Sequence, residues 1–268
     1  MPELPEIRSR AGEMHAALVG KTIQDVHVLQ PKCLNLPEDD FHAALAGATV
    51  NAVSSRGKWI CVETSQGWLL LNLGMGGEIL LTTPDSLPEK RRLVFDFTDG
   101  DCLAINFWWF GHAHFASDLA QHAQTRELGP NALDLGAEQL WAMIQGRRGR
   151  LKTFLLDQNQ VAGIGNAYIH DILFLAGLHP LRPLNSLSPD EVEKLAQAIQ
   201  DGLLPSLERG GAFYEQNLYG QPGGFTAEMI RIGYREGQPC PRCAASIEKI
   251  KTGGTSSFIC PQCQPLPH

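Results

Sequence analysis

Residues 240–263, CPRCAASIEKIKTGGTSSFICPQC, contain two Cys-x-x-Cys pairs separated by sixteen residues. Two short turns joined by a hairpin can bring four thiolates together, which is the tetrahedral ligand set of structural Zn²⁺. A site with four sulfur ligands is closed, so it stabilises a small fold and does not catalyse a reaction. The alternative is a pair of disulfides, which suits a secreted chain better than one without a secretory signal. We predict one structural zinc ion, bound by Cys240, Cys243, Cys260 and Cys263.

The composition limits the classes of protein to consider. A hydrophobic content of 43% is enough for folded cores, and no apolar run approaches the ~20 residues of a membrane span. We therefore expect an intracellular, cytoplasmic protein that does not enter a membrane. The other three cysteines, Cys33, Cys61 and Cys102, are scattered and are expected to be small buried apolar residues.

The net charge of −7 argues mildly against nucleic-acid binding, which depends on Lys and Arg. The charge is uneven, because residues 131–268 carry 12 Lys and Arg against 13 Asp and Glu and are nearly neutral. The cluster GRRGRLK at 146–152 is compatible both with a solvated face and with a binding site. A local basic surface therefore stays possible.

The order of predicted elements indicates several domains. Residues 21–115 contain short β-rich runs with turns such as SQG at 65–67 and DGD at 99–101, a pattern typical of a sandwich or barrel. After residue 128 the apolar period becomes helical. The clearest helix is LSPDEVEKLAQAI at 187–199, where Ser188 is an N-cap and Glu191 completes a capping box.

The chain begins MPELPE, and its two prolines call for different explanations. Pro5 suits the first turn of a helix whose apolar face recurs every three to four residues, at Ile7, Ala11, Met14 and Leu18. Pro2 is not explained in this way. If Met1 is removed, Pro2 presents a secondary amine that can attack an electrophilic carbon and form an iminium.

These features together resemble the formamidopyrimidine-DNA glycosylase and endonuclease VIII family over essentially the whole chain. The motifs that carry the resemblance occur in the family's order: PELPE (2–6), RGKW (56–59), LGMGG (73–77), LGPNALD (128–134), LKTFLLDQNQVAGIGNAY (151–168), GLHP (177–180) and the four-cysteine hairpin. The resemblance implies an α+β multidomain fold. Its parts are an N-terminal helix and β-sandwich catalytic domain (1–127), a helix-two-turns-helix DNA-binding domain with a lesion-capping loop (128–232) and a zinc-finger hairpin (233–268).

The resemblance implies an enzyme of base excision repair, a DNA glycosylase with AP lyase activity. Pro2 corresponds to the family's nucleophile, which attacks C1′ of the damaged nucleotide and forms a Schiff base. The Schiff base then leads to β- and δ-elimination. Glu3 matches the residue that moves protons at the sugar, and Lys58 a lysine that contacts phosphate beside the lesion. The expected partner is double-stranded DNA with a damaged base or an abasic site, bound by a monomer, with zinc as the only cofactor.

Three further residues match DNA contacts of the family. Asn166, in GIGN, matches a phosphate ligand, and Gly163 and Gly165 allow close approach of the backbone. Lys152 fits a second phosphate contact, with a helix salt bridge as the alternative. Met75 matches a residue that enters the gap left by the flipped base, although such a methionine is otherwise most often core.

The chain departs from the family at two places, and both remove charge. Thr255 stands at the hairpin tip where relatives carry an arginine, so Lys249 or Lys251 would have to supply the lost charge. In INFWWFG (105–111), Trp108 and Trp109 stand where many relatives have two arginines before Phe110. We expect one tryptophan to point into the sandwich and the other to stack in the DNA, with poor discrimination of the opposite base.

Residues 211–229 resemble the lesion-capping loop. Two other functions are compatible with these departures. One is a lesion-sensing DNA-binding protein of the same fold that does not cut. The other is an enzyme that prefers abasic sites or bulky adducts over oxidised bases.

Overall fold

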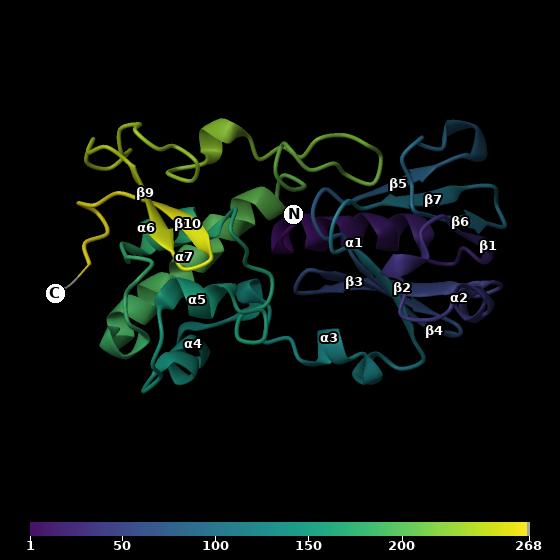
Figure 1. Ribbon diagram of the computed structural model, residues 1–268, viewed down its shortest axis with the longest axis horizontal. Helices are drawn as coiled ribbons and strands as arrows, with labels where there is room; N and C mark the ends of the chain where they lie inside the picture. Colours follow the sequence, from purple (N-terminus) through teal and green to yellow (C-terminus); the bar gives the residue numbers. More distant parts are fainter. Residues whose placement is uncertain (267–268) are drawn as a thin grey trace. The chain divides into compact units, whose positions relative to one another are not determined.

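The computed structural model describes residues 1–266 and divides into two compact units (Figure 1). The first unit comprises Met1–Glu127 together with Arg209–Gly224. The second comprises Leu128–Glu208 and the chain from Phe225 onward. The chain therefore returns to the first unit for sixteen residues before it forms the C-terminal hairpin.

The first unit begins with helix α1 (Leu4–Leu18). Glu3 is its N-cap and Pro5 lies in its first turn, where the missing N–H costs nothing. The backbone N–H of Glu3 donates to the Oε2 of Glu6 over 2.9 Å, which completes the start of the helix. The predicted apolar face is confirmed, since Ile7, Ala11, Met14 and Leu18 are all buried.

Two four-stranded antiparallel sheets complete this unit and confirm the predicted sandwich. Three of its strands, β2 (Val50–Arg56), β5 (Glu78–Thr82) and β8 (His112–Ala116), do not stand out in the sequence as β-rich runs. One sheet has the order β1 (Ile23–Val28), β6 (Leu93–Phe97), β7 (Cys102–Asn106) and β5 (Glu78–Thr82). The other has the order β2 (Val50–Arg56), β3 (Trp59–Thr64), β4 (Gly67–Asn72) and β8 (His112–Ala116).

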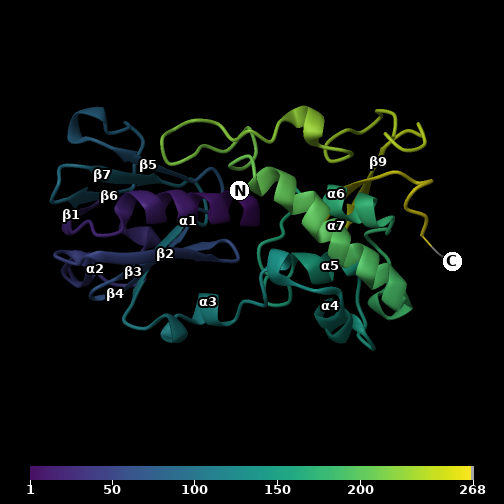
Figure 2. The same cartoon turned by 180° about the vertical axis from the view of Figure 1, so that it is seen from behind.

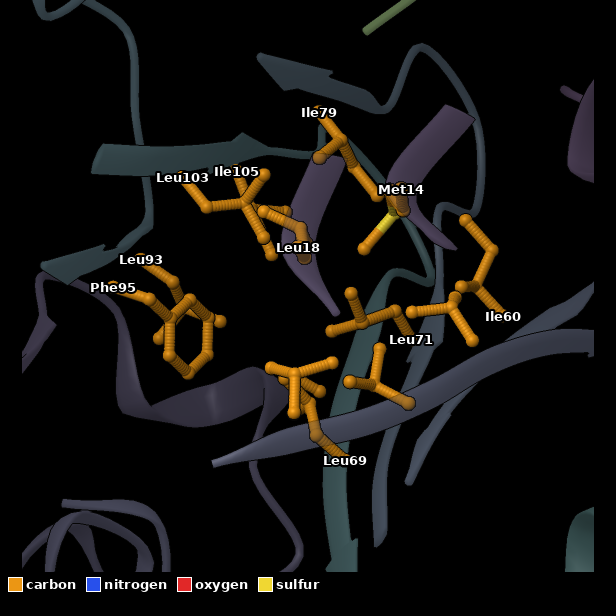
Figure 3. Close-up of a cluster of buried hydrophobic side chains, with 14 of the residues drawn as sticks. Met14, Leu18, Ile60, Leu69, Leu71, Ile79, Leu93, Phe95, Leu103 and Ile105 are labelled. Carbon is orange, nitrogen blue, oxygen red and sulfur yellow. The ribbon is translucent and has the colours of Figure 1, made fainter. Parts of the chain in front are cut away.

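The core of this unit is a single apolar cluster to which α1 and both sheets contribute. Figure 3 shows Met14 and Leu18 of α1 directed toward leucine, isoleucine and phenylalanine side chains of the strands. The unit also contains short elements: α2 (Glu38–Leu45), α3 (Ala123–Arg126) and the 3-10 turns Pro31–Cys33, Pro84–Ser86 and Leu119–Gln121. Cys33, Cys61 and Cys102 are buried as predicted.

The second unit is helical. Its helices are α4 (Ala137–Ile144), α5 (Leu151–Leu156), α6 (Ile169–Ala176) and α7 (Pro189–Leu207), with 3-10 turns at Ala132–Asp134, Leu184–Ser186 and Ala227–Met229. The predicted capping box of α7 is present, because Ser188 and Glu191 satisfy each other's backbone N–H groups. Helix α6 ends at Gly177, whose φ of 69° places it in the left-handed region that glycine tolerates.

The C-terminal hairpin of the same unit consists of β9 (Glu248–Thr252) and β10 (Thr255–Ile259), drawn in yellow in Figure 1, and β9 is also labelled in the view from behind in Figure 2. Its apolar side chains Ile247 and Phe258 belong to a small cluster with Phe174 of α6. Arg242 fixes the neighbouring turn by donating to the carbonyl oxygen of Phe174 over 2.9 Å. Among residues 1–266, no helix is both long and apolar enough to span a membrane.

Candidate functional site

The amino end of the chain lies against a carboxylate of the returning segment 209–224. The amino nitrogen of Met1 is 3.4 Å from the Oε1 of Glu215, whose side chain is 12% exposed. Burial raises the pKa of Glu215 above its ordinary value, and the Met1 ammonium acts in the opposite direction. Pro2 and Glu3 follow directly and are both buried.

Carboxylates of α1 hold the returning segment in place. The Oε1 of Glu6 accepts a hydrogen bond from the backbone N–H of Ala212 over 3.0 Å, and the Oε2 of Glu13 accepts one from Leu218 over 2.8 Å. Gly211 has a φ of 103°, and a Cβ there would lie 2.9 Å from the side chain of Glu6. A glycine is therefore needed where the segment passes α1.

Glu215 is the residue of this region that sequence reasoning misses. It is the only acidic residue between 210 and 227, so a lone carboxylate in an otherwise uncharged segment is the signal that could have found it. Local pattern cannot show that the segment returns to the chain's amino end, because the contact joins residues more than two hundred positions apart.

Lys58 lies in the turn between β2 and β3, directly after Gly57, which has a φ of 56°. The lysine is half-buried, and within residues 1–266 its ammonium group forms no hydrogen bond or ion pair. The next residue, Trp59, is buried and stacks on His112, with ring centroids 5.9 Å apart. The tryptophan thus anchors the turn, while the ammonium group of Lys58 has no partner among the described residues.

Met75 and the segment 108–110 form an exposed apolar surface, here called the aromatic tip. Met75 is 46% exposed, and Trp108, Trp109 and Phe110 are between 62% and 74% exposed. Met75 exchanges backbone hydrogen bonds with the segment: its N–H donates to the carbonyl of Trp109 over 2.9 Å, and its carbonyl accepts from Trp108 over 3.3 Å. The structure therefore brings the two loops together.

The expectation that one of the two tryptophans points into the sandwich is wrong. Strand β7 ends at Asn106, so the alternation of a strand does not extend to residues 108 and 109. Phe107 takes the buried position instead and is 5% exposed. The loop then turns sharply at Phe110, whose φ of 56° is rare for a residue with a side chain.

Asn166 lies in the turn that precedes α6 and is half-buried. Gly163 has a φ of 104°, and its N–H donates to the Oε1 of Gln158 over 2.9 Å, so the turn is fixed by its own side chains. The Oδ1 of Asn166 accepts a hydrogen bond from the ammonium group of Lys152 over 2.9 Å. These two predicted site residues are therefore in direct contact.

Lys152 differs from its expected surroundings. It is 2% exposed, its ammonium group faces protein oxygens, and no carboxylate within the described part of the chain forms a salt bridge with it. The helix salt bridge considered as an alternative is thus not formed. Thr255, in contrast, is exposed at the hairpin tip as expected, and Lys249 and Lys251 are exposed on β9.

The four cysteines of the hairpin converge as predicted. Their sulfur atoms all lie within 4.8 Å of one another. The separations are 3.8 Å for Cys240 and Cys263, 3.4 Å for Cys243 and Cys260, and 3.6 Å for Cys243 and Cys263. Zinc–sulfur bonds of about 2.3 Å in a tetrahedron require sulfur separations of about 3.8 Å, so this set of donors fits one zinc ion.

Comparison with known proteins agrees with this architecture in all three regions. Residues 1–106 match the formamidopyrimidine-DNA glycosylase N-terminal domain, residues 128–217 the H2TH domain of the same enzymes, and residues 237–266 a zinc finger found in FPG and IleRS. A formamidopyrimidine-DNA glycosylase of Chloroflexus aurantiacus is 34% identical over 273 residues, which cover 98% of each chain.

Solved structures of Lactococcus lactis Fpg are similar over nearly the same length. Wild-type Fpg in complex with DNA containing N7-benzyl-Fapy-dG has a TM-score of 0.90 and 28% identity, covering 98% of this chain and 100% of that one. The complex of Fpg with DNA containing an abasic site has a TM-score of 0.89 and 27% identity, covering 98% and 99%.

The chain therefore belongs to the formamidopyrimidine-DNA glycosylase family. Within that class it is a DNA glycosylase of base excision repair with a C-terminal zinc-finger fold.

Proposed function

We propose that the protein is a bifunctional DNA glycosylase and AP lyase that acts as a monomer on double-stranded DNA with an oxidised base. The observation that carries the proposal is the amino end of the chain. Pro2 lies there at the start of α1, beside the buried Glu3 and near Glu215, which contacts Met1. Removal of Met1 would free the secondary amine of Pro2 among these carboxyl groups.

The reaction would proceed through a covalent intermediate. The Pro2 amine attacks C1′ of the damaged nucleotide as the C1′–N bond to the base breaks, and the proton lost by the Pro2 nitrogen balances the proton that the departing base takes up. Glu3 donates a proton to O4′ as the sugar ring opens, which produces an iminium between Pro2 and C1′. Loss of a C2′ proton then expels the 3′-phosphate, and a second elimination expels the 5′-phosphate.

DNA contacts would come from residues in both units. A phosphate contact by Lys58 is supported by the position of its ammonium group, which has no partner within residues 1–266, on a turn that Trp59 anchors. A phosphate contact by Asn166 is supported by the glycine-rich turn in which this residue lies. Thr255 would contact phosphate at the hairpin tip, with Lys249 or Lys251 supplying charge.

We also propose functional domains at 1–127, 128–232 and 233–268, the second of which includes a loop at 211–229 that covers the lesion.

The aromatic tip would occupy the space vacated by the flipped base. Base flipping costs a few kcal/mol, so apolar side chains are needed to hold the duplex open. The exposure of Met75, Trp108, Trp109 and Phe110 supports this role. An indole ring stacks on any base and carries a single hydrogen-bond donor, so the opposite base would be read poorly.

The four cysteines would hold Zn²⁺, and the ion would stabilise the hairpin without taking part in the reaction. The geometry of the sulfur atoms supports this assignment. The zinc site thus serves to present Thr255 and the two lysines of β9.

A second candidate is a lesion-sensing DNA-binding protein that does not cut. The exposed Thr255 favours it, because a hydroxyl group cannot replace the bidentate, charged contact of an arginine. A preference for abasic sites or bulky adducts is a third possibility. Pro2, Glu3 and Lys58 favour the enzyme, since a binding protein has no need of a reactive amine beside an acid.

The test is base excision from a duplex with one oxidised guanine, using protein whose free Pro2 terminus is verified by mass spectrometry. Glu3→Gln should slow excision by about 10²-fold or more, because the amide cannot donate a proton at O4′. Glu38→Gln, an exposed change on α2, is the matched control and should leave the rate unchanged. Equal rates for Glu3→Gln and the wild type would contradict the assignment.

The same DNA can test how strictly the protein reads the base opposite the lesion. Cleavage should be similar opposite all four bases, and a strong preference for cytosine would contradict the stacking role of the tryptophans.

Lys251→Ala should lower the slope of log affinity against log salt by about one if this lysine contacts phosphate. An unchanged slope would reject that contact.

A further inference from the structure

Lys152 has an unusual set of neighbours for a lysine. Its Nζ donates to the Oδ1 of Asn166 over 2.9 Å, the carbonyl of Ser256 over 2.6 Å and the Oγ of Ser257 over 2.9 Å. A fourth oxygen, the Oγ1 of Thr252, lies at 3.3 Å. An ammonium group carries three donors, so these acceptors saturate it.

This ammonium group is buried without a counter-charge. Burial lowers the pKa of Lys152 to about 8, and no salt bridge to it is formed by any residue from 1 to 266. Burying an unpaired cation is costly even when it is hydrogen-bonded. Its hydrogen bonds offset part of this cost, because they satisfy oxygens of two different segments that are buried or partly buried.

The neighbours belong to two separate structural elements of the second unit. Asn166 is in the turn before α6, whereas Thr252, Ser256 and Ser257 are in the β9–β10 hairpin. The hairpin oxygens are linked further, because the hydroxyl of Thr252 lies 2.9 Å from that of Ser257 and donates to the carbonyl of Thr255 over 3.1 Å. Lys152 thus ties the turn to the hairpin tip.

The contact also determines the orientation of the Asn166 amide. An ammonium group can only donate, so the oxygen of the amide must face Lys152 and its NH₂ group must face away. Within the described residues, no hydrogen bond is recorded for that NH₂ group. A free amide donor next to the start of a helix is suited to a phosphate oxygen.

We propose that Lys152 is a positioning residue for DNA binding, which turns the NH₂ group of Asn166 toward a phosphate and joins this turn to the zinc-finger tip. The proposal rests on the proposed function, in which Asn166 and the tip contact DNA. It replaces the expected direct phosphate contact of Lys152, whose donors are already used within the protein.

The experiment is a double-mutant cycle on affinity for a duplex with one tetrahydrofuran abasic analogue. The variants are Lys152→Met, Asn166→Ala and the double variant, with Lys194→Ala as a control that removes an exposed charge on α7, outside the basic cluster at 146–152. Zinc content and thermal melting are measured for each. If Lys152 acts through Asn166, each single change should weaken binding about tenfold and the double variant little more than either.

The salt dependence separates positioning from direct contact. A lysine that neutralises a phosphate contributes about one to the slope of log affinity against log salt. Lys152→Met should therefore leave the slope within a fraction of one unit. Additive losses in the cycle, or a slope lowered by about one, would overturn the proposal.

Asn166→Asp keeps the proposal testable if Lys152→Met fails to fold. A carboxylate at 166 supplies the missing counter-charge but no donor, so this variant should melt at a higher temperature than Asn166→Ala while binding abasic DNA at least tenfold more weakly than the wild type. Equal melting of Asn166→Asp and Asn166→Ala would show that the contact does not matter. A wild type without affinity for abasic DNA would instead reject the proposed function.

Discussion

Three histidines packed around Trp59 form a buried cluster in the first unit. The Nδ1 of His114 lies 2.9 Å from the Nε2 of His122, and the Nδ1 of His122 lies 2.9 Å from the hydroxyl of Thr125. His112 stacks on Trp59 at the edge of the cluster. Burial, followed by the proximity of the other two histidines, lowers the pKa of His114 to about 4.

This cluster predicts a loss of stability in acid. An unfolded histidine has a pKa of about 6.5, so between pH 6.5 and 4 the unfolded chain binds more protons than the folded one, and the free energy of unfolding falls as the pH falls. For His114 the loss should be about 2 kcal/mol between pH 7 and 5. Urea unfolding followed by fluorescence measures it.

The control for this prediction is a second histidine change in the same unit. His114→Gln should remove the share of the pH dependence that comes from His114, with His15→Gln, a change of an exposed side chain on α1, as the control. Identical pH dependence in the wild type and His114→Gln would contradict the assignment.

The aromatic tip gives a second prediction at single residues. Trp108→Ala and Trp109→Ala should each change the free energy of unfolding by less than about 0.5 kcal/mol, because both side chains are mostly exposed. Each should weaken binding to abasic DNA by about 1–3 kcal/mol if it stacks on a base. Lost stability with unchanged affinity would show that the tryptophans are structural instead.

Among the elements, α6 shows how one side chain can fix a distant segment. The carboxylate of Asp171 accepts hydrogen bonds from three consecutive backbone N–H groups: from Arg231 over 2.7 Å, from Ile232 over 2.9 Å and from Gly233 over 3.0 Å. These bonds give partners to backbone N–H groups that would otherwise have none. They also hold the chain in place where it enters the zinc finger.

Asp171→Asn should therefore lower the free energy of unfolding of the second unit by about 2 kcal/mol, because a neutral amide has one oxygen and weaker acceptor strength. Asp201→Asn is the matched control, since Asp201 is exposed on α7 and its carboxylate accepts a hydrogen bond from the Gln197 side chain. Chemical denaturation of both variants measures the difference. Equal stabilities would mean that the three N–H groups find other partners.

The zinc hairpin predicts a distinct pattern of thiol reactivity. Removal of the metal by a chelator should expose four reactive thiols and melt the hairpin, because β9 and β10 have few apolar contacts of their own. Cys33, Cys61 and Cys102 should stay unreactive, since burial raises the pKa of each thiol to about 11 or 12. Seven reactive thiols in the folded protein would contradict this division.

Local patterns predict some elements and miss others for physical reasons. The start of α7 is readable because Ser188 and Glu191 lie three residues apart and satisfy each other. The exposure of the Trp108 and Trp109 side chains cannot be predicted from the local sequence. It depends on where β7 stops and on Gly74 of another loop, where a Cβ would lie 2.1 Å from the carbonyl of Trp109.

For the molecule as a whole, sequence reasoning finds the sandwich, the helical region and the zinc hairpin but not the path of the chain between them. Residues 211–229 read as a single loop, whereas the structure assigns Arg209–Gly224 to the first unit. The bonds that hold this segment join it to Glu6 and Glu13 of α1. Such contacts depend on tertiary structure, so Glu215 could not be placed beside Met1 from sequence alone.

The central claim is that the amine of Pro2 forms the covalent bond to DNA. The most direct measurement is borohydride trapping on a duplex with one abasic site, comparing Met1-processed protein with a chain whose uncleaved N-terminal extension converts the Pro2 nitrogen to an amide. The account predicts a covalent complex for the processed protein, attached at Pro2 by peptide mapping, and none for the extended chain. Equal trapping of both, or no complex from protein with a verified free Pro2, would contradict it.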